Sequence, residues 1–558
     1  MSIAPAPHPD QPTQLVTILS GRWYRVCGIT AHQRADIENM LTMRNGRRAQ
    51  QLRYSARPDE DEPEFVHGYA DPGGGDLLVA PGAVGHVELL LRDLGADVAI
   101  LDERPQPAPR PRLEYRGEKR SYQDKFVTEM LAEPNGMGVG PCGSGKTDTL
   151  IDLMIRRGQR WLITVRQTDL VSQWAERIKA RTNGTVTIYK PQNVRKWDPE
   201  ADFMVATAQA LIRHPDHCFR IDEEREGLCV DECDEVPANE MVALMKLFAP
   251  RWRIGATATP LRADGMTPLM YWWIGPCLAK IPREVVEEEG HLLRPRLEVL
   301  ETRFSAETRV DLTGTPKEIR KAQRKNEDEI DDHIHEDESR VGDICQRVCE
   351  LAQAGRRVLI PVDSIAYGYR LREALLTAID GVEFCHAKPA KLRVKKIQKE
   401  LDRLAIAGIT TEAFNISRKM RREMLARVAS GATRVLIATS LADRGLDLPI
   451  ADVTVFATPG GSARRIEQQG GRSCRPAPGK PQPLWVYVLD SGVSRVETVT
   501  SAETGARETL VKRPLIARFR RNFYNVFRKM ADTDEVAVRR ILKGETRDQP
   551  SSEPVRAA

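Results

Sequence analysis

The sequence predicts an α/β fold in which parallel sheets are covered by helices. Short apolar stretches, each long enough for one buried strand, alternate with helical patterns from about residue 120 to about residue 490. Such alternation is typical of parallel strands joined by crossover helices. A polar stretch rich in Lys, Asp and Glu at 316–337 separates the strand and helix signals into two blocks. We therefore expect two tandem parallel-sheet domains.

The remaining sequence falls into flanking segments. A smaller unit with its own strand and helix signals precedes the first block and ends in a proline-rich run at 104–111, a composition that favours an extended linker. The predicted divisions are a disordered lead-in (1–14), a small N-terminal α/β domain with its proline-rich linker (15–112), the first sheet domain (113–300), an inter-domain linker (301–337), the second sheet domain with a basic insertion at 386–410 (338–495), and a short helical C-terminal extension (496–558) that is disordered from about 550.

Composition points to a protein of the reducing cytoplasm. Of the 558 residues, 41% are hydrophobic and 29% charged, which suits ordinary packed cores. Ten cysteines without a C-x-x-C pair favour unpaired thiols and argue against a zinc site. The N-terminus lacks the pattern of an export signal, and the apolar stretches are too short to span a membrane. The net charge of +5 favours polyanionic partners only weakly.

Residues 140–147, with the sequence GPCGSGKT, match the phosphate-loop pattern G-x-x-x-x-G-K-[ST]. Glycines there let backbone N–H groups turn toward phosphates, Lys146 reaches the β and γ oxygens, and the Thr147 hydroxyl can bind Mg²⁺. A helical pattern follows directly, so the phosphates would lie at a helix N-terminus. A glycine-rich surface turn is the alternative. The expected nucleotide-binding residues of the loop are Gly140, Pro141, Cys142, Gly143, Ser144, Gly145, Lys146 and Thr147.

The stretch at 227–234 predicts a short apolar strand that ends in two acids. Asp231, at the tip of that strand, can hold the Mg²⁺ that Thr147 touches, and Glu232 can orient and deprotonate the attacking water. A strand that merely ends in a solvated acidic turn is the alternative. We favour the metal site, because the acids follow a phosphate loop in the same domain.

With the residues DECD at 231–234, the chain resembles the superfamily 2 helicases, in which a DEAD or DEAH box occupies this place. Other stretches match family motifs in the family's order. They are RSYQ at 120–123, LVSQW at 170–174, ATAQAL at 206–211, GATATP at 255–260, VLIATSLADRGLDLP at 435–449 and QQGGRSCR at 468–475. Two further stretches, LRADG at 261–265 and IGP at 274–276, resemble the branch that contains XPB, RadD and the phage UvsW-type enzymes.

Some positions depart from the family pattern. Ser121 stands where the adenine-reading motif usually has proline, and Arg166 with Gln167 replaces a Pro-Thr pair. The resemblance implies two RecA-like lobes that close on Mg·ATP. It also implies that Tyr122 and Gln123 bind adenine.

The second block carries the residues that a lone phosphate loop lacks. Two arginines three residues apart can project toward a phosphate, and an arginine finger is worth about 10³ to 10⁵ in rate. By analogy Arg475 is the finger and Arg472 a γ-phosphate ligand. The resemblance adds Gly445 and Asp447 as nucleotide contacts. The expected catalytic residues are Lys146, Asp231, Glu232, Gln468, Arg472 and Arg475.

Nucleic-acid contacts are expected at two places. The resemblance nominates backbone contacts by Gln167, Thr207, Gln209 and Thr439. Composition alone indicates an amphipathic helix with a basic face at 388–403, where a solvated face and a nucleic-acid contact are equally open. Its candidate contacts are Lys391, Arg393, Lys395 and Lys396.

Two aromatic features favour packing over binding. Phe519, Phe523 and Phe527 recur every four residues, which predicts a buried helical stripe with basic residues between them. The pair at 272–273, Trp-Trp, is interpreted as packing. The N-terminal unit resembles the leader domain of UvsW-type helicases, which implies a contact with duplex or branched DNA; a scaffold packed on the first lobe is the alternative.

These features predict an ATP- and Mg²⁺-dependent DNA helicase or translocase, of bacterial or phage origin, that acts on duplex, forked or branched DNA in replication, recombination or repair. Three alternatives stay open: the motor subunit of a restriction or defence complex, an RNA helicase, and a binding scaffold with a vestigial ATPase.

Overall fold

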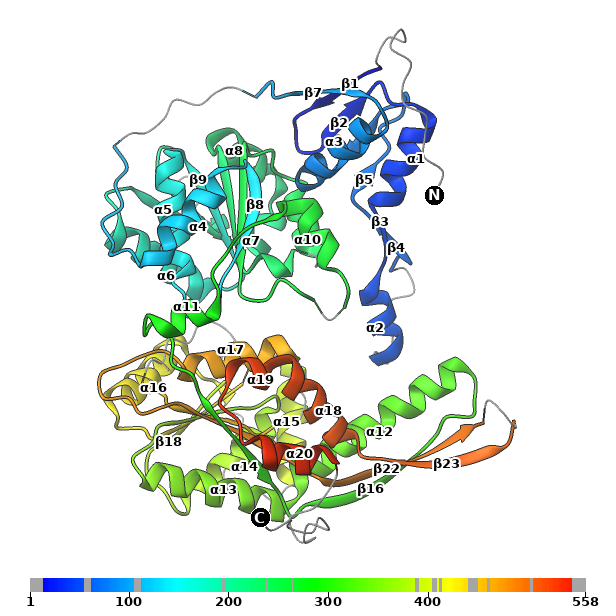
Figure 1. Cartoon of the computed structure of the whole chain (residues 1–558). Helices are drawn as coiled ribbons and strands as arrows, with labels where there is room; N and C mark the ends of the chain where they lie inside the picture. The colour runs from blue at the N-terminus through cyan, green and yellow to red at the C-terminus, as the bar shows by residue number, and fades with distance from the viewer. Residues whose placement is uncertain are drawn as a thin grey trace, which may run out of the picture. The chain divides into compact units, whose positions relative to one another are not determined.

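The computed structural model describes residues 14–54, 62–104, 112–192, 197–236, 239–262, 264–386, 391–403, 409–410, 414–439, 450–458, 462–501 and 505–543. The chain forms two compact units, Met1–Val285 and Val286–Ala558 (Figure 1). Within the described residues, no helix is both long enough and apolar enough to cross a membrane. The segments expected to be disordered, 1–14 and the residues from about 550, lie outside the described residues, apart from Gln14.

The first unit contains a seven-stranded, wholly parallel sheet in the order β10-β11-β9-β12-β13-β8-β14. The all-buried pattern of the central β9 explains its near-continuous apolar sequence. The strands are β8 (Asn135–Val139), β9 (Trp161–Val165), β10 (Val186–Ile188), β11 (Phe203–Thr207), β12 (Gly227–Asp231), β13 (Trp252–Thr257) and β14 (Cys277–Lys280). The helical segments are α4 (Ser121–Leu131), α5 (Lys146–Arg157), α6 (Thr168–Arg181), α7 (Ala208–Ile212), α8 (Pro215–Glu224), η3 (Cys233–Glu235), α9 (Asn239–Met245) and α10 (Thr267–Ile274). α11 (Arg283–Glu288) includes the residues at which the chain passes from the first unit to the second.

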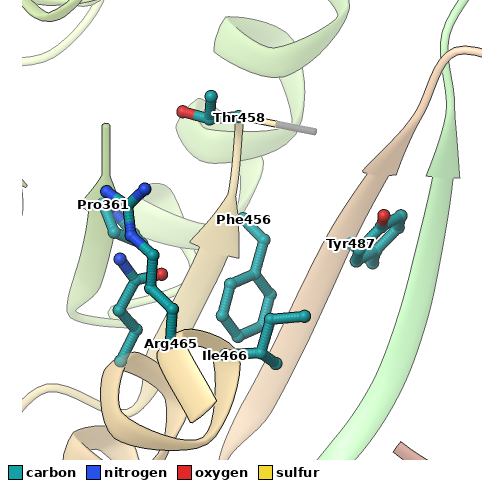
Figure 2. A pocket seen from close by; sticks show the side chains of 7 residues that line it. Pro361, Phe456, Thr458, Arg465, Ile466 and Tyr487 are labelled. Carbon is teal, nitrogen blue, oxygen red and sulfur yellow. The ribbon is translucent and has the colours of Figure 1, made fainter. Parts of the chain in front are cut away.

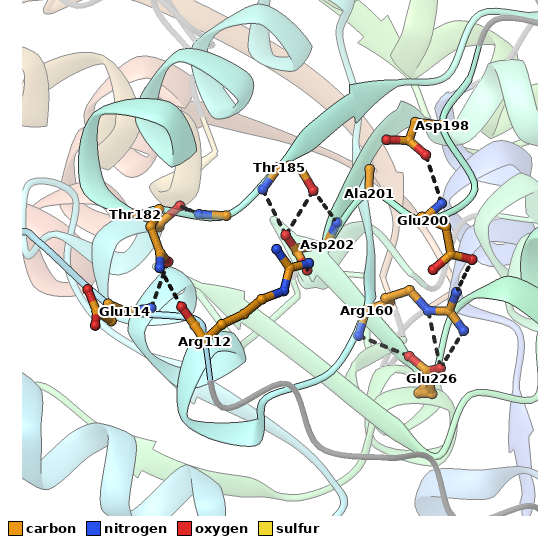
Figure 3. A network of polar contacts seen from close by, with 12 residues as sticks. Arg112, Glu114, Arg160, Thr182, Thr185, Asp198, Glu200, Ala201, Asp202 and Glu226 are labelled. Carbon is orange, nitrogen blue, oxygen red and sulfur yellow. Dashed lines mark hydrogen bonds and ion pairs between the residues drawn. The ribbon is translucent and has the colours of Figure 1, made fainter.

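The amino-terminal edge of this sheet is held by ion pairs and hydrogen bonds (Figure 3). The Arg160 guanidinium binds Glu226 at 3.0 Å, so the residues that precede β9 and β12 are linked. Asp202, which precedes β11, accepts hydrogen bonds from the backbone N–H and the hydroxyl of Thr185, each at 2.8 Å. These contacts involve backbone groups and neighbouring strands, so we assign this edge a structural role.

The N-terminal domain belongs to the same compact unit. Its five-stranded sheet has the order β5-β6-β2-β1-β7, in which only the β1–β7 pair is parallel. The elements are β1 (Leu15–Leu19), β2 (Tyr24–Cys27), α1 (Ala31–Met40), β3 (Thr42–Arg44), α2 (Gly46–Tyr54), β4 (Phe65–His67), β5 (Tyr69–Ala70), β6 (Leu77–Val79), η1 (Pro81–Ala83), α3 (Val84–Asp93) and β7 (Asp97–Leu101).

A shared apolar core joins the N-terminal domain to α10. The rings of Trp23 and Trp273 meet edge to face at 4.8 Å between centroids. Trp272 and Trp273 are both buried, which confirms their predicted packing role. The domain therefore packs on the first lobe, while its role as a scaffold and its predicted DNA contact both stay predictions.

The second unit contains a six-stranded parallel sheet in the order β15-β21-β20-β17-β19-β18. The strands are β15 (Arg296–Glu301), β17 (Val358–Pro361), β18 (Val382–Cys385), β19 (Val435–Ala438), β20 (Val453–Phe456) and β21 (Leu484–Leu489). The helices are α13 (Glu338–Gln353), α14 (Ile365–Leu376), α15 (Lys391–Arg403), α16 (Arg418–Ser430) and α17 (Ala463–Ser473). The two parallel sheets with their helices confirm the predicted fold class.

An arm extends from the second sheet (Figure 1). It consists of a three-stranded sheet, β16 (Ser305–Asp311), β22 (Gly492–Thr500) and β23 (Arg507–Lys512), covered by α12 (Pro316–Glu336). The predicted linker at 301–337 thus contains regular structure. Its polar composition is that of an exposed helix, which buries Ile330 and Ile334 and starts at a capping box between Thr315 and Glu318.

The C-terminal extension packs back on the second sheet. It contains α18 (Pro514–Asn522), the π-helical turn η5 (Phe523–Phe527), α19 (Arg528–Met530) and α20 (Glu535–Lys543). Phe519, Phe523 and Phe527 are buried, which confirms the predicted stripe.

The docking of the N-terminal domain depends on close backbone approach at Gly82. A Cβ there would lie 2.3 Å from the Tyr271 carbonyl oxygen and 2.4 Å from the Gly275 nitrogen, and these backbone atoms cannot move aside cheaply. We expect Gly82→Ala to lower the free energy of unfolding by about 1–3 kcal/mol in urea denaturation. Gly85, inside α3, has open space around its Cβ position, so Gly85→Ala should be neutral or stabilising by up to about 1 kcal/mol. Equal effects of the two variants would contradict this account.

Candidate functional site

The predicted site residues of the first unit lie at the carboxyl edge of its parallel sheet. In the strand register, Thr257 is opposite Val139, Asp231 is opposite Ala256, and Thr207 is opposite Val165. Residues that follow these strands therefore meet along one edge, as is typical of binding sites in parallel sheets. The phosphate loop, the acidic box and the predicted nucleic-acid contacts all start there.

The phosphate loop runs between β8 and α5. Gly143 and Gly145 have φ of 90° and 82°, values that residues with a Cβ rarely adopt, so the pattern's fixed Gly145 has a conformational reason. α5 begins at Lys146, and its Nζ donates to the carbonyl oxygens of Gly140 and Pro141 at 2.9 and 3.1 Å. The ammonium group therefore adds its charge to the positive end of a helix.

Three residues from the start of α4 support the loop from behind. The Arg120 guanidinium donates to the Gly143 carbonyl oxygen at 2.8 Å, and the Tyr122 hydroxyl donates to the Ser144 carbonyl oxygen at 3.1 Å. Gln123 is buried and its amide lies 3.5 Å from the Gly145 carbonyl oxygen. Tyr122 and Gln123 thus touch the loop, while their predicted adenine contacts stay predictions. The motif at 120–123 contains Arg120, but the sequence predicts no site role for it; its contact with the loop is seen only in the structure.

Asp231 ends β12 and is held by two donors. Its carboxylate accepts a hydrogen bond from the Trp174 indole N–H at 2.9 Å and from the Glu232 backbone N–H at 3.0 Å. Burial and the neighbouring Glu232 charge raise the pKa of Asp231 to about 6, against the opposing effects of Trp174 and Lys146. Lys146 is therefore close enough to act electrostatically on the acid, as a joint phosphate and metal site requires.

Glu232 has a left-handed backbone with φ of 54°, and no other non-glycine residue within the described ranges has a positive φ. Such a conformation costs about 1–3 kcal/mol and persists where the surroundings impose it, often at functional sites. It turns the chain directly after β12, so Asp231 and Glu232 leave the strand in different directions.

The box is also tied to the end of β13. The Thr257 hydroxyl donates to the buried Asp234 carboxylate at 2.8 Å. The Arg262 guanidinium donates to the Asp234 carbonyl oxygen at 2.5 Å and to the Asp264 carboxylate at 2.9 Å. The stretches around 231–234 and 255–265, which were matched to separate motifs, are thus one hydrogen-bonded assembly.

The predicted nucleic-acid contacts of this unit lie on the same edge. Gln167 precedes α6 as its N-cap, and the Thr207 hydroxyl accepts a hydrogen bond from the Ala210 backbone N–H at the start of α7. Gln209 is exposed. These placements are compatible with backbone contacts, which remain predictions.

In the second unit, the predicted residues lie near β19, β20 and β21. Ser473, next to Arg472, accepts a hydrogen bond from the Thr454 hydroxyl in the first half of β20 at 2.9 Å. Thr439 follows β19 and is buried. Gln468 and Arg472 lie on α17 and are largely buried, and Arg475 follows the helix. Gly470 lets α17 approach β21, since a Cβ there would lie 2.5 Å from the Trp485 ring. Gly445 and Asp447 lie outside the described residues.

A small pocket of about 20 Å³ lies between β17, β20 and α17. Arg465 and Ile466 of α17 line it together with Thr458 at the end of β20 (Figure 2). It has room for about one water molecule, so we assign it no ligand.

The predicted basic helix exists as α15. Arg393, Lys395 and Lys396 are exposed while Leu401 is buried, so the basic side chains face outward as expected. The side chain of Lys391 lies outside the described set. Exposure alone does not decide between a solvated face and a nucleic-acid contact.

Comparison with known proteins agrees with this geometry. The family model described as Type III restriction enzyme, res subunit, matches residues 116–262, and the helicase conserved C-terminal domain matches residues 346–477. The matches fall on the two parallel sheets and include both the phosphate loop and the two arginines. The chain belongs to the superfamily 2 helicases, in their XPB-like branch. Its two matched domains are those of an ATP-dependent helicase enzyme.

Two XPB relatives support this assignment to the branch. The helicase is 24% identical over 407 residues to the DNA 3'-5' translocase XPB2 of Sulfurisphaera tokodaii, covering 69% of this chain and 84% of that protein. It is 29% identical over 254 residues to the DNA 3'-5' helicase XPB of Mycobacterium tuberculosis, covering 43% of this chain and 45% of that protein. The crystal structure of T4 UvsW aligns with a TM-score of 0.36 and 15% identity, over 93% of this chain and 99% of that one.

The raised pKa of Asp231 makes a prediction about stability. Folding favours the protonated carboxyl, so the ionised form costs stability above about pH 6, and this cost disappears below about pH 4. Asp231→Asn keeps an acceptor for Trp174 without the charge. We expect the free energy of unfolding of the variant, measured in urea without nucleotide or Mg²⁺, to exceed that of the wild type by up to about 3 kcal/mol near pH 7.5. Near pH 4 the two values should be almost equal. A difference that does not change with pH would contradict this assignment.

Proposed function

We propose that this helicase uses ATP hydrolysis to translocate on DNA and to remodel duplex, forked or branched DNA. One observation carries the proposal: the carboxyl edge of the first sheet brings Lys146 and its phosphate loop into electrostatic contact with Asp231. The two XPB relatives named above, a DNA 3'-5' translocase and a DNA 3'-5' helicase, support DNA as the substrate.

The residues at this edge fit a magnesium ion. Mg²⁺ prefers oxygen ligands and retains several waters, so one carboxylate and one hydroxyl suffice beside nucleotide phosphates. We assign Asp231 and Thr147 to the ion, which would neutralise charge on the phosphates when bound. Lys146 would hold the β and γ phosphates, and Glu232 would orient the attacking water and take its proton.

The second unit would supply the remaining charge. Arg475 acts as the arginine finger, Arg472 binds the γ-phosphate, and Gln468 positions them from α17. Tyr122 and Gln123 bind adenine beside the loop they already touch. Gly445 and Asp447 complete the nucleotide contacts. Gln167, Thr207, Gln209 and Thr439 bind the DNA backbone, and the basic side chains of α15 extend this contact.

We place this activity in DNA replication, recombination or repair in the bacterial cytoplasm. The protein would be encoded by the bacterium or by a phage that infects it. The cytoplasmic assignment is supported by the ten cysteines, which all lie within the described residues and form no disulfide there.

A second candidate is the motor subunit of a restriction complex. The match of residues 116–262 to the res-subunit model favours it. Affinity purification of the tagged chain from its native cell would decide, because a restriction motor should bring down a stoichiometric nuclease.

The proposal predicts which polymer stimulates ATP hydrolysis. We expect phosphate release to rise at least about tenfold with single-stranded, duplex or forked DNA and to change little with RNA. Arg475→Ala should bind a labelled ATP analogue as the wild type does, and its stimulated hydrolysis should fall by about 10³-fold or more. Arg422→Ala, an exposed arginine on α16, is the matched control and should hydrolyse normally. Stimulation by RNA alone, or undiminished turnover in Arg475→Ala, would sink the proposal.

Trp174 should act as a positioning residue for Asp231. Trp174→Phe retains the buried ring but removes the N–H that orients the carboxylate. We expect the Mg²⁺ affinity of the nucleotide complex, measured by calorimetry, to fall by about 10- to 100-fold. Trp161→Phe is the control, because that buried indole donates to the Met154 carbonyl oxygen. Equal Mg²⁺ affinities in the two variants would show that the Trp174 contact is only structural.

A further inference from the structure

The C-terminal extension contains a stretch with strongly unbalanced charge. Residues 509–531 include seven Lys or Arg and no Asp or Glu, whereas the whole chain has a formal net charge of only +5. The sequence interpretation assigned the phenylalanines of this stretch to the core and left its basic residues facing solvent or phosphate. The structure shows how those basic side chains are displayed.

The buried side of this segment is firmly anchored. α18, η5 and α19 follow one another from Pro514 to Met530 without a break. The Phe519 and Phe527 rings lie 5.1 and 5.5 Å from the Tyr487 ring of β21, and Phe527 also meets Trp485 at 6.0 Å. Such aromatic packing fixes the rotation of the helix about its axis. The opposite side is therefore held in one orientation.

That opposite side is a basic stripe, which consists of Arg520, Arg521, Tyr524, Arg528 and Lys529. All five residues are exposed. At 1.5 Å per residue, the stripe extends over about 14 Å. Tyr524 lies at the centre of the stripe and is 50% exposed. The Arg528 guanidinium lies 6.0 Å from the centre of the Tyr524 ring. An exposed aromatic ring between cationic side chains suits base stacking beside phosphate contacts.

The charge of the stripe is not neutralised by neighbouring acids. In the part of the chain that the structure describes, no carboxylate forms an ion pair with any of its four basic residues. The nearby acids are engaged elsewhere: Asp532 pairs with Arg294 at 2.9 Å, and Glu535 pairs with Arg539 at 2.8 Å. An un-neutralised row of cations fits a polyanion, and the ring at its centre favours one with accessible bases.

We propose that the basic stripe is a second nucleic-acid site, which binds single-stranded DNA through its phosphates and stacks one base on Tyr524. The choice of DNA as the polyanion rests on the proposed function. The stripe lies on α18, η5 and α19, so it is separate from the predicted contacts on the sheet edges and on α15. It would hold a strand whether or not nucleotide is bound.

The experiment measures fluorescence anisotropy of a labelled 20-nucleotide single strand without ATP, over a range of salt concentrations. The test variant combines Arg520→Gln, Arg521→Gln, Arg528→Gln and Lys529→Gln. We expect its affinity to fall at least about tenfold, with the slope of log K against log salt reduced by up to about 3, because each lost phosphate contact contributes about 0.7. The control combines Arg309→Gln, Lys317→Gln, Arg320→Gln and Lys321→Gln, four charges on the arm, and should bind normally.

Tyr524 separates stacking from charge. Tyr524→Ala should weaken single-strand binding by about fivefold or more, while Tyr524→Phe, which keeps the ring, should bind like the wild type. Circular dichroism and thermal unfolding check that each variant is folded. Equal losses in the stripe and arm variants would overturn the proposal, since net charge alone would then explain binding. A larger loss on duplex than on single-stranded DNA would overturn the choice of strand.

Failure of the stripe and failure of the proposed function are distinguishable. If the stripe variant binds DNA unchanged while DNA still stimulates wild-type ATP hydrolysis, the stripe proposal is wrong and the function stands. If no DNA binds the wild type or stimulates its ATPase, the proposed function itself is wrong, and the stripe proposal fails with it.

Discussion

A half-buried carboxylate, Asp231, is the constraint around which the first unit is arranged. Removing such a group from water disfavours its ionised form, and the raised pKa expresses that cost. The Trp174 indole and the Glu232 amide offset part of this cost by donating hydrogen bonds, and the charge of Lys146 offsets a further part. A bound cation would complete the compensation. An acid whose charge is only partly compensated in the free protein suits a metal site, because a bound cation supplies the missing compensation.

The contacts of the box continue outward to the N-terminal domain. Arg262 joins the Asp234 backbone to Asp264, and the Asp264 carbonyl lies against Gly46, where a Cβ would come within 1.6 Å of its oxygen. Beside this contact, buried Glu62 accepts hydrogen bonds from Asn45 and from Asn239 at the start of α9. The N-terminal domain therefore touches both segments that flank the acidic box. Packing of this kind can transmit a displacement, because close-packed interfaces shift rather than compress.

Sequence reasoning worked where function depends on local spacing. The phosphate loop, the acid after β12 and the strand-helix alternation are all set by residues within a few positions of one another, so they could be predicted. The motif at 170–174 predicts no partner for Trp174, because Asp231 is 57 positions away and no local pattern marks the contact. The polar composition of 301–337 predicts a linker, whereas the structure has the capped helix α12 there. The sequence pattern of this helix is weak because its buried stripe is narrow. The roles of Arg472 and Arg475 rest on resemblance and stay predictions.

The second unit also contains a buried charged group, the guanidinium of Arg340. Arg340 is fully buried, and its guanidinium binds Asp490 at 2.8 Å, the Ala457 carbonyl oxygen at 2.6 Å and the Tyr367 hydroxyl at 2.5 Å. Asp490 also accepts the Thr302 hydroxyl at 2.6 Å.

These partners follow β21, β20, β17 and β15, which are four consecutive strands of the sheet. A buried ion pair is weak evidence for stability, because desolvation consumes most of its Coulomb energy. The geometry of the pair gives a better reason for burying Arg340. The planar guanidinium and its partner Asp490 together link residues that follow four strands. The carboxyl edge that presents Thr458 is thereby positioned by hydrogen bonds rather than by apolar packing alone.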